Sequence, residues 1–283
     1  MSVSTQSGSG VVAGAESGSA ATAEHLLVVK GLSKDFGALR AVSDISFEVQ
    51  KGRIFAIIGP NGAGKTTAFN LITNVYPATS GEIVFANQNI MGMPEHKITE
   101  LGIARTFQKV RLFKNITVLD NVLVGMHCRT KSGVWDAFLN TPRKKNEEKA
   151  SIQRALELLQ FVSIEEFQGA LARELSYGDQ RRLEIARALA TQPRLLLLDE
   201  PVAGMNPIEK DEMMSLIHTI RSSGVTVLLV EHDMKVVMGI SEEIVVLDHG
   251  VKIAEGTPVE VQSNEAVIEA YLGKGFRREP ARS

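Results

Sequence analysis

The stretch "RIFAIIGPNGAGKTTAFNLIT", Arg53 to Thr73, joins an apolar run to a helical pattern through a glycine-rich loop. The loop, Gly59 to Thr66, matches G-x-x-x-x-G-K-[ST] and lies between a predicted strand and a predicted helix, where this motif carries its chemistry. Its glycines let backbone N–H groups turn inward around phosphate oxygens, while the helix N-terminus and Lys65 add positive charge. The pattern predicts a P-loop that binds a nucleoside triphosphate, with the Thr66 hydroxyl as a candidate Mg²⁺ ligand.

Two carboxylates follow the most apolar strand of the chain, "RLLLLDE", which ends at Asp199 and Glu200. Ligands of an open parallel sheet bind beyond the carboxyl ends of its strands, so we expect both carboxylates at the same edge as the P-loop. Asp199 is predicted to hold Mg²⁺, directly or through water, and Glu200 to orient or deprotonate the water that attacks the γ-phosphate. His232 ends another strand, "VTVLLVEH", and is predicted to contact the γ-phosphate. Lys65, Glu200 and His232 are the candidate catalytic residues.

The apolar runs predict an α/β fold with a mostly parallel central sheet. Those of the second half are continuous rather than alternating, which is typical of parallel strands covered on both faces. Helical patterns separate them, one over Pro207–Ser222 behind the N-cap residue Asn206 and another from Asp233. The first half is β-rich. The predicted strands are Leu26–Lys30, Ala41–Glu48, Arg53–Ile58, Gly81–Phe85, Leu195–Leu198, Val225–Val230 and Ile244–Leu247.

The middle of the chain reads differently. From about Met126 to Ala150 the pattern loosens, which indicates an insertion or a helical subdomain. Apolar spacing at Ile152, Leu156 and Leu159 then predicts an amphipathic helix, and the spacing along residues 183–190 predicts another.

The composition limits the function classes. Lys plus Arg number 31 against 33 Asp plus Glu, a net charge of −2, so no bulk basic field draws the chain to nucleic acid or anionic lipid. A single cysteine, Cys128, excludes an internal disulfide and a thiolate metal cage. The apolar runs are far shorter than the roughly 20 residues of a membrane helix. Residues 1–24 have the Ser/Gly/Ala composition of a disordered tail and lack the pattern of a secretion signal.

The stretch "LSYGDQ", Leu175 to Gln180, lies just before the carboxylate strand, at the position of the L-S-G-G-Q signature of ABC transporters. Ser176 and Gly178 open the helix "DQRRLEIARALA", so they form a second anion site at a helix N-terminus. With these motifs in order, the chain resembles the ATP-binding subunit of an ABC transporter from about Leu26 to Phe276. The resemblance implies a P-loop NTPase cassette over residues 25–276, with an N-terminal antiparallel β subdomain, a helical subdomain at about 109–190 and a C-terminal tail at 277–283.

The resemblance also implies ATP and Mg²⁺ as cofactors, and it adds residues to the site. Phe36 matches the aromatic residue that stacks on adenine, and Gln108, in "ARTFQ", matches the glutamine that links the metal site to the membrane subunits. The metal residues are then Thr66, Gln108 and Asp199. The implied nucleotide-binding residues are Phe36, Gly59, Pro60, Asn61, Gly62, Ala63, Gly64, Lys65, Thr66, Thr67, Gln108, Ser176, Tyr177, Gly178, Asp179 and Asp199.

In this family the signature grips the γ-phosphate held by the P-loop of a partner cassette. One P-loop and one signature per chain therefore imply a dimer. The segment "KVRLFKN", Lys109 to Asn115, is predicted to present Val110, Leu112 and Phe113 to a helix of a membrane partner. The alternative is that these apolar side chains fill the core of the helical subdomain. For Leu112 the two interpretations are equally supported by the sequence.

Two departures from the family pattern narrow the resemblance. Tyr177 replaces the first glycine of the signature, and Asn206 stands where many members carry an aspartate. With "GIARTFQKVRLFKNITVLDNVLVG", "EHDMKVVMGIS" and "VIEAYLGKGF", they resemble the ATPase subunits that drive high-affinity uptake of branched-chain amino acids in bacteria.

The subfamily implies two integral-membrane permease subunits, a second ATP-binding subunit, identical or paralogous, and indirectly a periplasmic solute-binding protein. It places the chain at the cytoplasmic face of the inner membrane, with no nucleic-acid partner. Cassettes for urea or amide uptake and for lipopolysaccharide export remain alternatives. A soluble, non-transport ABC ATPase is an alternative of another class, but such proteins usually carry two cassettes or a long coiled coil.

Overall fold

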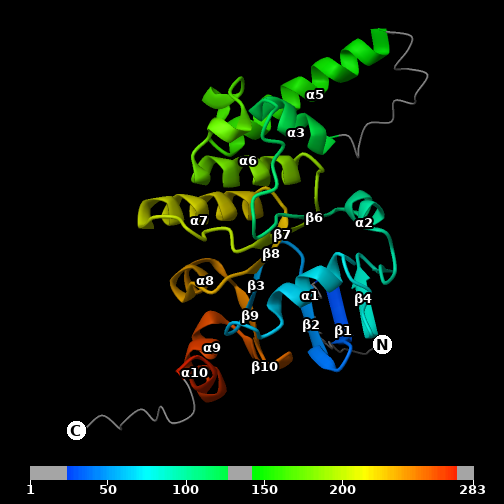
Figure 1. Cartoon of the computed structure of the whole chain (residues 1–283), viewed down its shortest axis with the longest axis vertical. Coiled ribbons are helices and arrows are strands. Elements are labelled where there is room, and N and C mark those ends of the chain that lie inside the picture. Colours follow the sequence, from blue (N-terminus) through cyan, green and yellow to red (C-terminus); the bar gives the residue numbers. More distant parts are fainter. Residues whose placement is uncertain (1–23, 127–141, 273–283) are drawn as a thin grey trace, which may run out of the picture.

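The computed structural model describes residues 24–126 and 142–272. The predicted tails at 1–24 and 277–283 therefore lie almost wholly outside the described residues, as do Cys128 and most of the loosely patterned segment. The described strands form two sheets, with helices packed on both faces of the larger one (Figure 1). The predicted α/β class is confirmed; the exact domain boundaries stay predictions.

The larger sheet has six strands in the order β10-β9-β3-β8-β7-β6. Five of them run parallel, as predicted, and β3, β7 and β8 are buried along their whole length. Both neighbours of β3 come from the C-terminal half of the chain. The strands are β3 Ile54–Ile58, β6 Ile103–Arg105, β7 Leu195–Asp199, β8 Thr226–Val230, β9 Glu243–Asp248 and β10 Val251–Gly256.

Strand β10 was not among the predicted strands, and it runs antiparallel to β9. His249 and Gly250 join the two strands with φ angles of 44° and 81°, the left-handed pair of a tight two-residue hairpin. As an edge strand, β10 is largely exposed and has no continuous apolar run. The continuous apolar run that identified the buried strands is therefore absent from β10.

The smaller sheet confirms the antiparallel β subdomain. Its order is β2-β1-β4-β5, with antiparallel pairing throughout. It packs against the larger sheet through one shared apolar cluster, in which the rings of Phe47 and Phe55 stack with centroids 5.6 Å apart. The strands are β1 His25–Phe36, β2 Leu39–Gln50, β4 Ser80–Phe85 and β5 Gln88–Asn89, so β1 extends well past the predicted end at Lys30.

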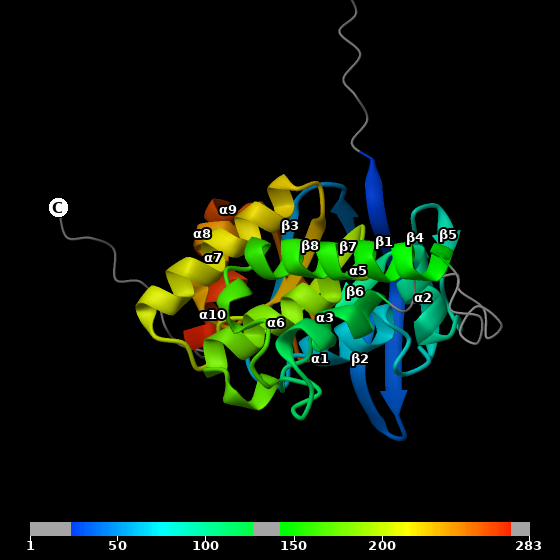
Figure 2. The same cartoon turned by 90° about the horizontal axis from the view of Figure 1, so that it is seen from above.

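Helices α3 (Val118–Met126), α5 (Pro142–Phe161) and α6 (Tyr177–Leu189) gather at one end of the molecule (Figure 1). Seen from above, α5 crosses over α3 and α6 (Figure 2), and all three helices are in mutual contact. The buried face of α5 carries Ala155, Leu158 and Leu159. This face confirms the amphipathic helix predicted over 152–159.

The remaining helices cover the two sheets. They are α1 Lys65–Ile72, α2 Glu95–Leu101, α7 Pro207–Ser222, α8 Met234–Ile240, α9 Pro258–Ser263 and α10 Glu265–Leu272, and short 3₁₀ turns lie at Glu165–Phe167 and Ala172–Glu174. Among the residues that the structure describes, no helix is both long and apolar enough to cross a membrane.

Helix α7 begins with a capping box. The Asn206 side chain accepts N–H bonds from Ile208 and Glu209 at 2.9 and 3.0 Å, and the Glu209 carboxylate accepts the Asn206 N–H at 2.9 Å. We expect Asn206→Ala to lower the free energy of unfolding by about 1 kcal/mol, because it orphans these donors. Asn206→Asp keeps a side-chain acceptor and should retain wild-type stability. Urea unfolding of the three proteins measures the difference, and an Ala variant as stable as the Asp variant would contradict the capping role.

Candidate active site

The P-loop connects β3 to α1 and can be built only with glycine at two positions. Gly59 and Gly64 have φ angles of 150° and 95°. A Cβ atom on Gly59 would lie 2.0 Å from the carbonyl oxygen of Leu247, and one on Gly64 would lie 2.6 Å from that of Ala41. The G-x-x-x-x-G spacing is therefore fixed by close backbone approach from β9 and β2 as well as by the turn itself.

Lys65, the first residue of α1, folds back over this loop. Its ammonium donates to the carbonyl oxygens of Gly59 and Pro60 at 2.7 and 2.9 Å, and only 7% of the residue is exposed. Burial lowers the pKa of Lys65, whereas the nearby carboxylates of Glu200 and Asp199 raise it. The loop carbonyls thus hold a cation over the predicted phosphate cradle.

A cavity of about 550 Å³ opens over the loop. It brings together segments far apart in sequence, among them Gln108, which precedes α3, and Glu200, which follows β7. These predicted residues share the cavity with most of the P-loop. Its lining is Leu39, Arg40, Ala41, Asn61, Gly62, Ala63, Gly64, Lys65, Thr66, Thr67, Gln108, Glu200 and His249.

Asp199 lies at the carboxyl end of β7 and is 1% exposed. One carboxylate oxygen is 3.4 Å from the Arg105 guanidinium, whereas the other, Oδ1, is buried with no hydrogen-bond partner among the described residues. Burial raises the pKa of Asp199, and Arg105 opposes that shift. Asp199 is not among the residues that line the P-loop cavity, whereas Thr66 and Gln108 are. Its unpaired buried oxygen, the Thr66 hydroxyl and the Gln108 amide are each the kind of hard oxygen donor that suits Mg²⁺.

Glu200 and His232 lie side by side, as predicted from their strand ends. Nδ1 of His232 is 3.8 Å from the nearer Glu200 carboxylate oxygen. Glu200 adopts a left-handed φ of 48°, and its N–H donates to the carbonyl of Val230 at 2.9 Å. This left-handed backbone conformation is unusual for a residue with a Cβ.

Glu231, which directly precedes His232, was not among the site residues predicted from the sequence. Its side chain is wholly buried and accepts N–H bonds from Val202 at 3.2 Å and His232 at 3.1 Å. Burial raises its pKa. It therefore ties the loop after β7 to the end of β8. A carboxylate placed directly after a buried strand was the available signal, the same one that identified Asp199.

Phe36 is not among the residues that line the P-loop cavity. It ends β1, is 43% exposed, and meets Tyr76 edge to face at 5.6 Å and the Lys34 ammonium at 5.0 Å. Leu39, Arg40 and His249, which sequence reasoning did not select, line the cavity instead. Adenine stacking by Phe36 stays a prediction.

The signature residues are also placed apart from the P-loop cavity. Ser176 caps α6, accepting the Asp179 N–H at 3.2 Å and donating to its carboxylate at 2.6 Å. Ser176, Gly178 and Asp179 line a separate cavity of about 680 Å³ between α6 and α7. Tyr177 is 45% exposed. Within one chain, the structure therefore keeps the predicted anion site at α6 away from the predicted phosphate cradle.

Comparisons with known proteins identify the family of the chain. The ABC transporter family matches residues 42–203, more than half of the chain. The chain belongs to the ABC transporter family. A second family, the branched-chain amino acid ATP-binding cassette transporter, matches residues 251–277. The cassette is therefore an ATPase that binds ATP and serves transport, and the predicted class of function is confirmed.

Relatives of the cassette span almost its whole length. The high-affinity branched-chain amino acid transport ATP-binding protein LivG of Salmonella typhimurium is 46% identical over 252 residues, 89% of this chain and 99% of that one. BraF of Pseudomonas aeruginosa, named for the same transport, is 46% identical over 250 residues, with 88% and 98% covered. The lipopolysaccharide export ATP-binding protein LptB of Escherichia coli is 34% identical over 251 residues, with 89% and 98% covered.

Solved structures agree with the fold of the cassette. Two crystal structures of ABC transporter cassettes, one nucleotide-free and one in the ADP conformation, each align with a TM-score of 0.77. Their identities are 32% and 33%, and the alignments cover 89% of this chain and all of theirs.

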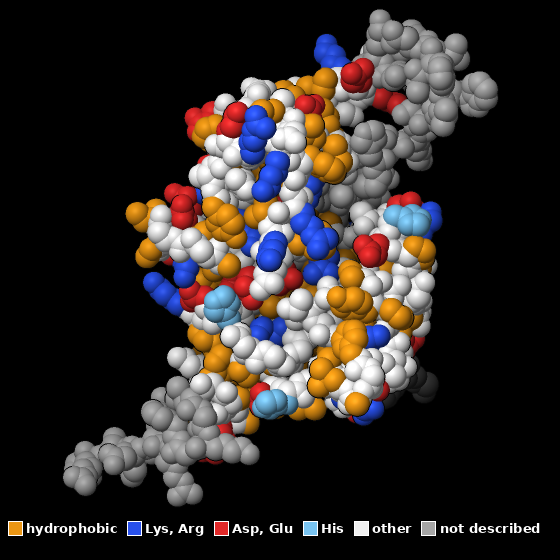
Figure 3. Space-filling model, viewed as in Figure 1, with side chains coloured by type: hydrophobic (Ala, Val, Ile, Leu, Met, Phe, Trp, Pro, Cys, Tyr) orange, Lys and Arg blue, Asp and Glu red, His pale blue; other side chains and the backbone are white. Residues whose placement is uncertain are grey.

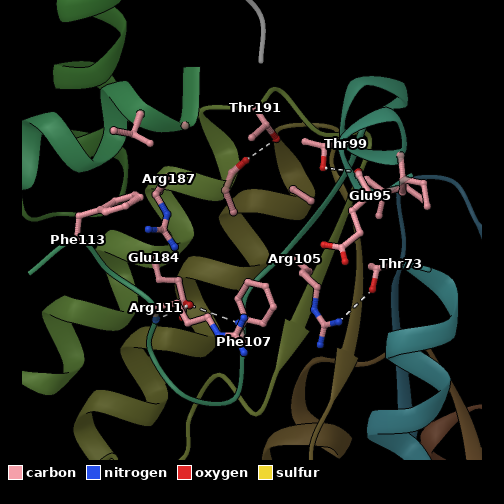
Figure 4. A pocket seen from close by; sticks show the side chains of 16 residues that line it. Thr73, Glu95, Thr99, Arg105, Phe107, Arg111, Phe113, Glu184, Arg187 and Thr191 are labelled. Atoms are coloured by element: carbon pink, nitrogen blue, oxygen red, sulfur yellow. Dashed lines mark hydrogen bonds between the residues drawn. The ribbon is translucent and has the colours of Figure 1, made fainter. Parts of the chain in front are cut away.

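The cassette carries another cavity, of about 470 Å³, between α2, β6, α3 and α6 (Figure 4). On its wall, the Phe107 ring lies between the guanidiniums of Arg105 and Arg111, which are 4.9 and 4.2 Å from its centroid. Phe113 is 53% exposed and has the Arg187 guanidinium 5.7 Å from its ring. Lys and Arg side chains gather on the face in Figure 3 where Figure 1 places α3 and α6.

The three apolar residues of the predicted docking segment lie in different environments. Leu112 packs against the main core, in line with the core alternative. Phe113 lines the cavity and is open to solvent, and Val110 is partly buried. Only Phe113 is thus both exposed and part of a groove.

Proposed function

We propose that this cassette drives the uptake of branched-chain amino acids through membrane permease subunits, working at the cytoplasmic face of the inner membrane. The observation that carries the proposal is the 46% identity to LivG along almost the full length of both chains, joined by the C-terminal match at residues 251–277. The lipopolysaccharide-export relative, at 34%, is more distant. Cassettes for urea or amides and a soluble ABC ATPase remain competing functions for the test below.

The test is uptake by a reconstituted transporter. The cassette, its permeases, a second cassette and the solute-binding protein would be assembled in vesicles with ATP on the cassette side. We expect ATP-dependent uptake of labelled leucine, isoleucine and valine and not of urea or short amides. Uptake of an amide alone, or hydrolysis with no transported solute, would overturn the solute assignment.

In the proposed reaction, the P-loop amides and Lys65 hold the β- and γ-phosphates of ATP. Thr66, Asp199 and Gln108 would hold Mg²⁺, which neutralises charge on those phosphates when bound. Glu200 orients the attacking water and accepts its proton, and His232, 3.8 Å from Glu200, contacts the γ-phosphate. Glu200 lines the cavity over the P-loop, which supports this role.

The proposal needs a second cassette. Ser176, Gly178 and Asp179 line their own cavity rather than that of the P-loop. We expect the anion site at the N-terminus of α6 to receive the γ-phosphate bound to a partner chain, with two ATP molecules between two cassettes. The partner is either a paralogue or a second copy, and Phe36 would stack on the adenine in each.

The permease docking site is proposed in the groove beside α3 and α6. Phe113 and Val110 would contact a helix of a permease, and the guanidiniums of Arg105, Arg111 and Arg187 give the groove a basic wall. Aromatic side chains in a groove are typical anchors for a helix of a partner protein.

We expect Phe113→Glu with Val110→Glu to leave the cassette folded and able to bind ATP. Introducing charge into a desolvated contact costs several kcal/mol, so co-purification with the permeases should fall at least about tenfold and uptake with it. Co-purification, thermal unfolding and ATP binding measure the three properties. Leu112→Glu is the matched control, since it should unfold the cassette. If the double variant also unfolds while permease binding per folded molecule stays normal, the docking site lies elsewhere.

A further inference from the structure

Arg181 is one of the largest wholly buried side chains of the cassette, although it carries a full charge. It lies on α6, four residues after Tyr177, and is 2% exposed. Its guanidinium donates to the carbonyl oxygen of Phe107 at 2.6 Å and also to that of Gln108. A buried guanidinium is stable only when such partners replace its hydration, so these two carbonyls are a large part of what holds it in place.

Glu184 completes the contact from the next turn of the same helix. It is 3.2 Å from the Arg181 guanidinium and is 1% exposed. Its other oxygen accepts the N–H groups of Phe107 at 3.4 Å and of Arg111 at 3.3 Å. Two side chains of α6 thus hold the main chain of residues 107–111, which lie outside the described helices and strands. This segment is therefore held in position by side chains of α6 and not by the backbone hydrogen bonds of a strand or helix.

Tyr177 connects the arrangement to the signature. Its hydroxyl oxygen is 3.2 Å from Nε of Arg181, and the guanidinium lies 5.4 Å from the ring centroid. The ring also lies close to the loop after β7, because a Cβ atom on Gly204 would lie 3.5 Å from Cε1 of Tyr177. A glycine, the usual residue at this place in the family, makes neither contact. The departure at Tyr177 therefore adds a bridge between the signature turn and the buried arginine.

We propose that Tyr177 and Arg181 form a positioning relay, through which engagement of the α6 N-terminus by a partner cassette's nucleotide sets the main-chain position of Gln108. The relay rests on the proposed function. Its two residues act through others. Arg181 lines neither the P-loop cavity nor the cavity between α6 and α7, and it joins the signature to the segment that carries the predicted metal ligand Gln108 and part of the permease groove. Because α6 is a continuous helix, its N-terminus and residues 107–111 move together as long as the relay is intact.

The experiment compares three variants in the complete transporter and measures solute transported per ATP hydrolysed. Arg181→Lys keeps the charge and loses the fork that reaches two carbonyls. Tyr177→Phe removes one oxygen from a half-exposed side chain and leaves the ring. Arg182→Lys is the matched control, since Arg182 is the next residue of α6 and bonds to Val162 and Glu212 instead.

We expect transported solute per ATP to fall about fivefold in Arg181→Lys, a loss at the lower end of the coupling between two linked sites. Tyr177→Phe should lower it in the same direction and by less, and Arg182→Lys should keep the wild-type ratio. A merely structural role would lower hydrolysis and transport in proportion and leave the ratio unchanged. Wild-type ratios in both Arg181→Lys and Tyr177→Phe would overturn the relay.

The relay and the proposed function fail in distinguishable ways. If the wild-type complex transports no branched-chain amino acid, the solute assignment is wrong. Should Arg181→Lys fail to fold, Tyr177→Phe alone decides, because its backbone and ring are unchanged. A Tyr177→Phe complex with the wild-type ratio then counts against the relay.

Discussion

Lys65→Ala should reduce ATP hydrolysis to background and weaken ATP binding by roughly 10- to 100-fold, the effect expected when a hydrogen-bonded charge is removed from a buried contact. The Lys65 ammonium is the cation that the loop holds at 2.7 and 2.9 Å from the carbonyl oxygens of Gly59 and Pro60. Without it, the phosphate charge faces a cavity that also holds the carboxylate of Glu200.

The fold should survive this change. The ammonium is largely desolvated, and its replacement removes a buried charge rather than a packed apolar group. Isothermal titration with ATP and thermal unfolding of the same samples separate the two effects. Lys51→Ala, which removes an exposed ammonium paired with Glu24, is the control and should bind ATP as the wild type does. Tight ATP binding by a folded Lys65→Ala protein would remove Lys65 from the phosphate site.

Glu200→Gln should leave ATP binding intact, unlike Lys65→Ala, while turnover falls about 10²- to 10⁴-fold, the range for loss of a general base. The amide keeps the shape of the side chain but accepts a proton poorly, and the P-loop is untouched. In the proposed dimer two ATP molecules lie between the two cassettes, so we expect an ATP-bound dimer to accumulate when this ATP is not hydrolysed.

Sedimentation with and without ATP measures the dimer, and phosphate release measures turnover. Glu165→Gln, on the 3₁₀ turn at 165–167, changes an exposed carboxylate and should show neither effect. Turnover in Glu200→Gln close to that of the wild type would transfer the role of base to another group. Glu231 would be the weaker candidate because its carboxylate is wholly buried and occupied by backbone N–H groups.

The sequence predicted the parts of the molecule that local chemistry determines. The P-loop could be found because glycines with left-handed φ, the lysine and the following helix are all written within one short stretch. Buried parallel strands were visible as continuous apolar runs, and the carboxylates at their ends could be assigned to one edge. Asn206 was recognised as an N-cap from its neighbour Pro207, and the capping box confirms it.

Features that depend on contacts between distant segments were not visible. Strand β10 has no continuous apolar run because none of its residues is fully buried. The lining by Leu39 and His249 depends on how two hairpin turns approach the P-loop. The apolar spacing of α6 does not single out Arg181 and Glu184, which become an internal pair only because α6 packs against residues 107–111. The spacing of apolar residues predicts which face of a helix is buried, but whether a charged residue is buried depends on which segment packs against it.

The order of the strands also bears on synthesis at the ribosome. The P-loop is made early, yet β3 lies between β8 and β9, and Gly59 rests against the carbonyl of Leu247 in β9. A nascent chain that has emerged only as far as α6 therefore has the full motif but neither of the strands that flank β3. Pairing over such long sequence separations forms late in folding. We therefore expect nucleotide binding to arise near the end of translation, once β8 and β9 have paired with β3.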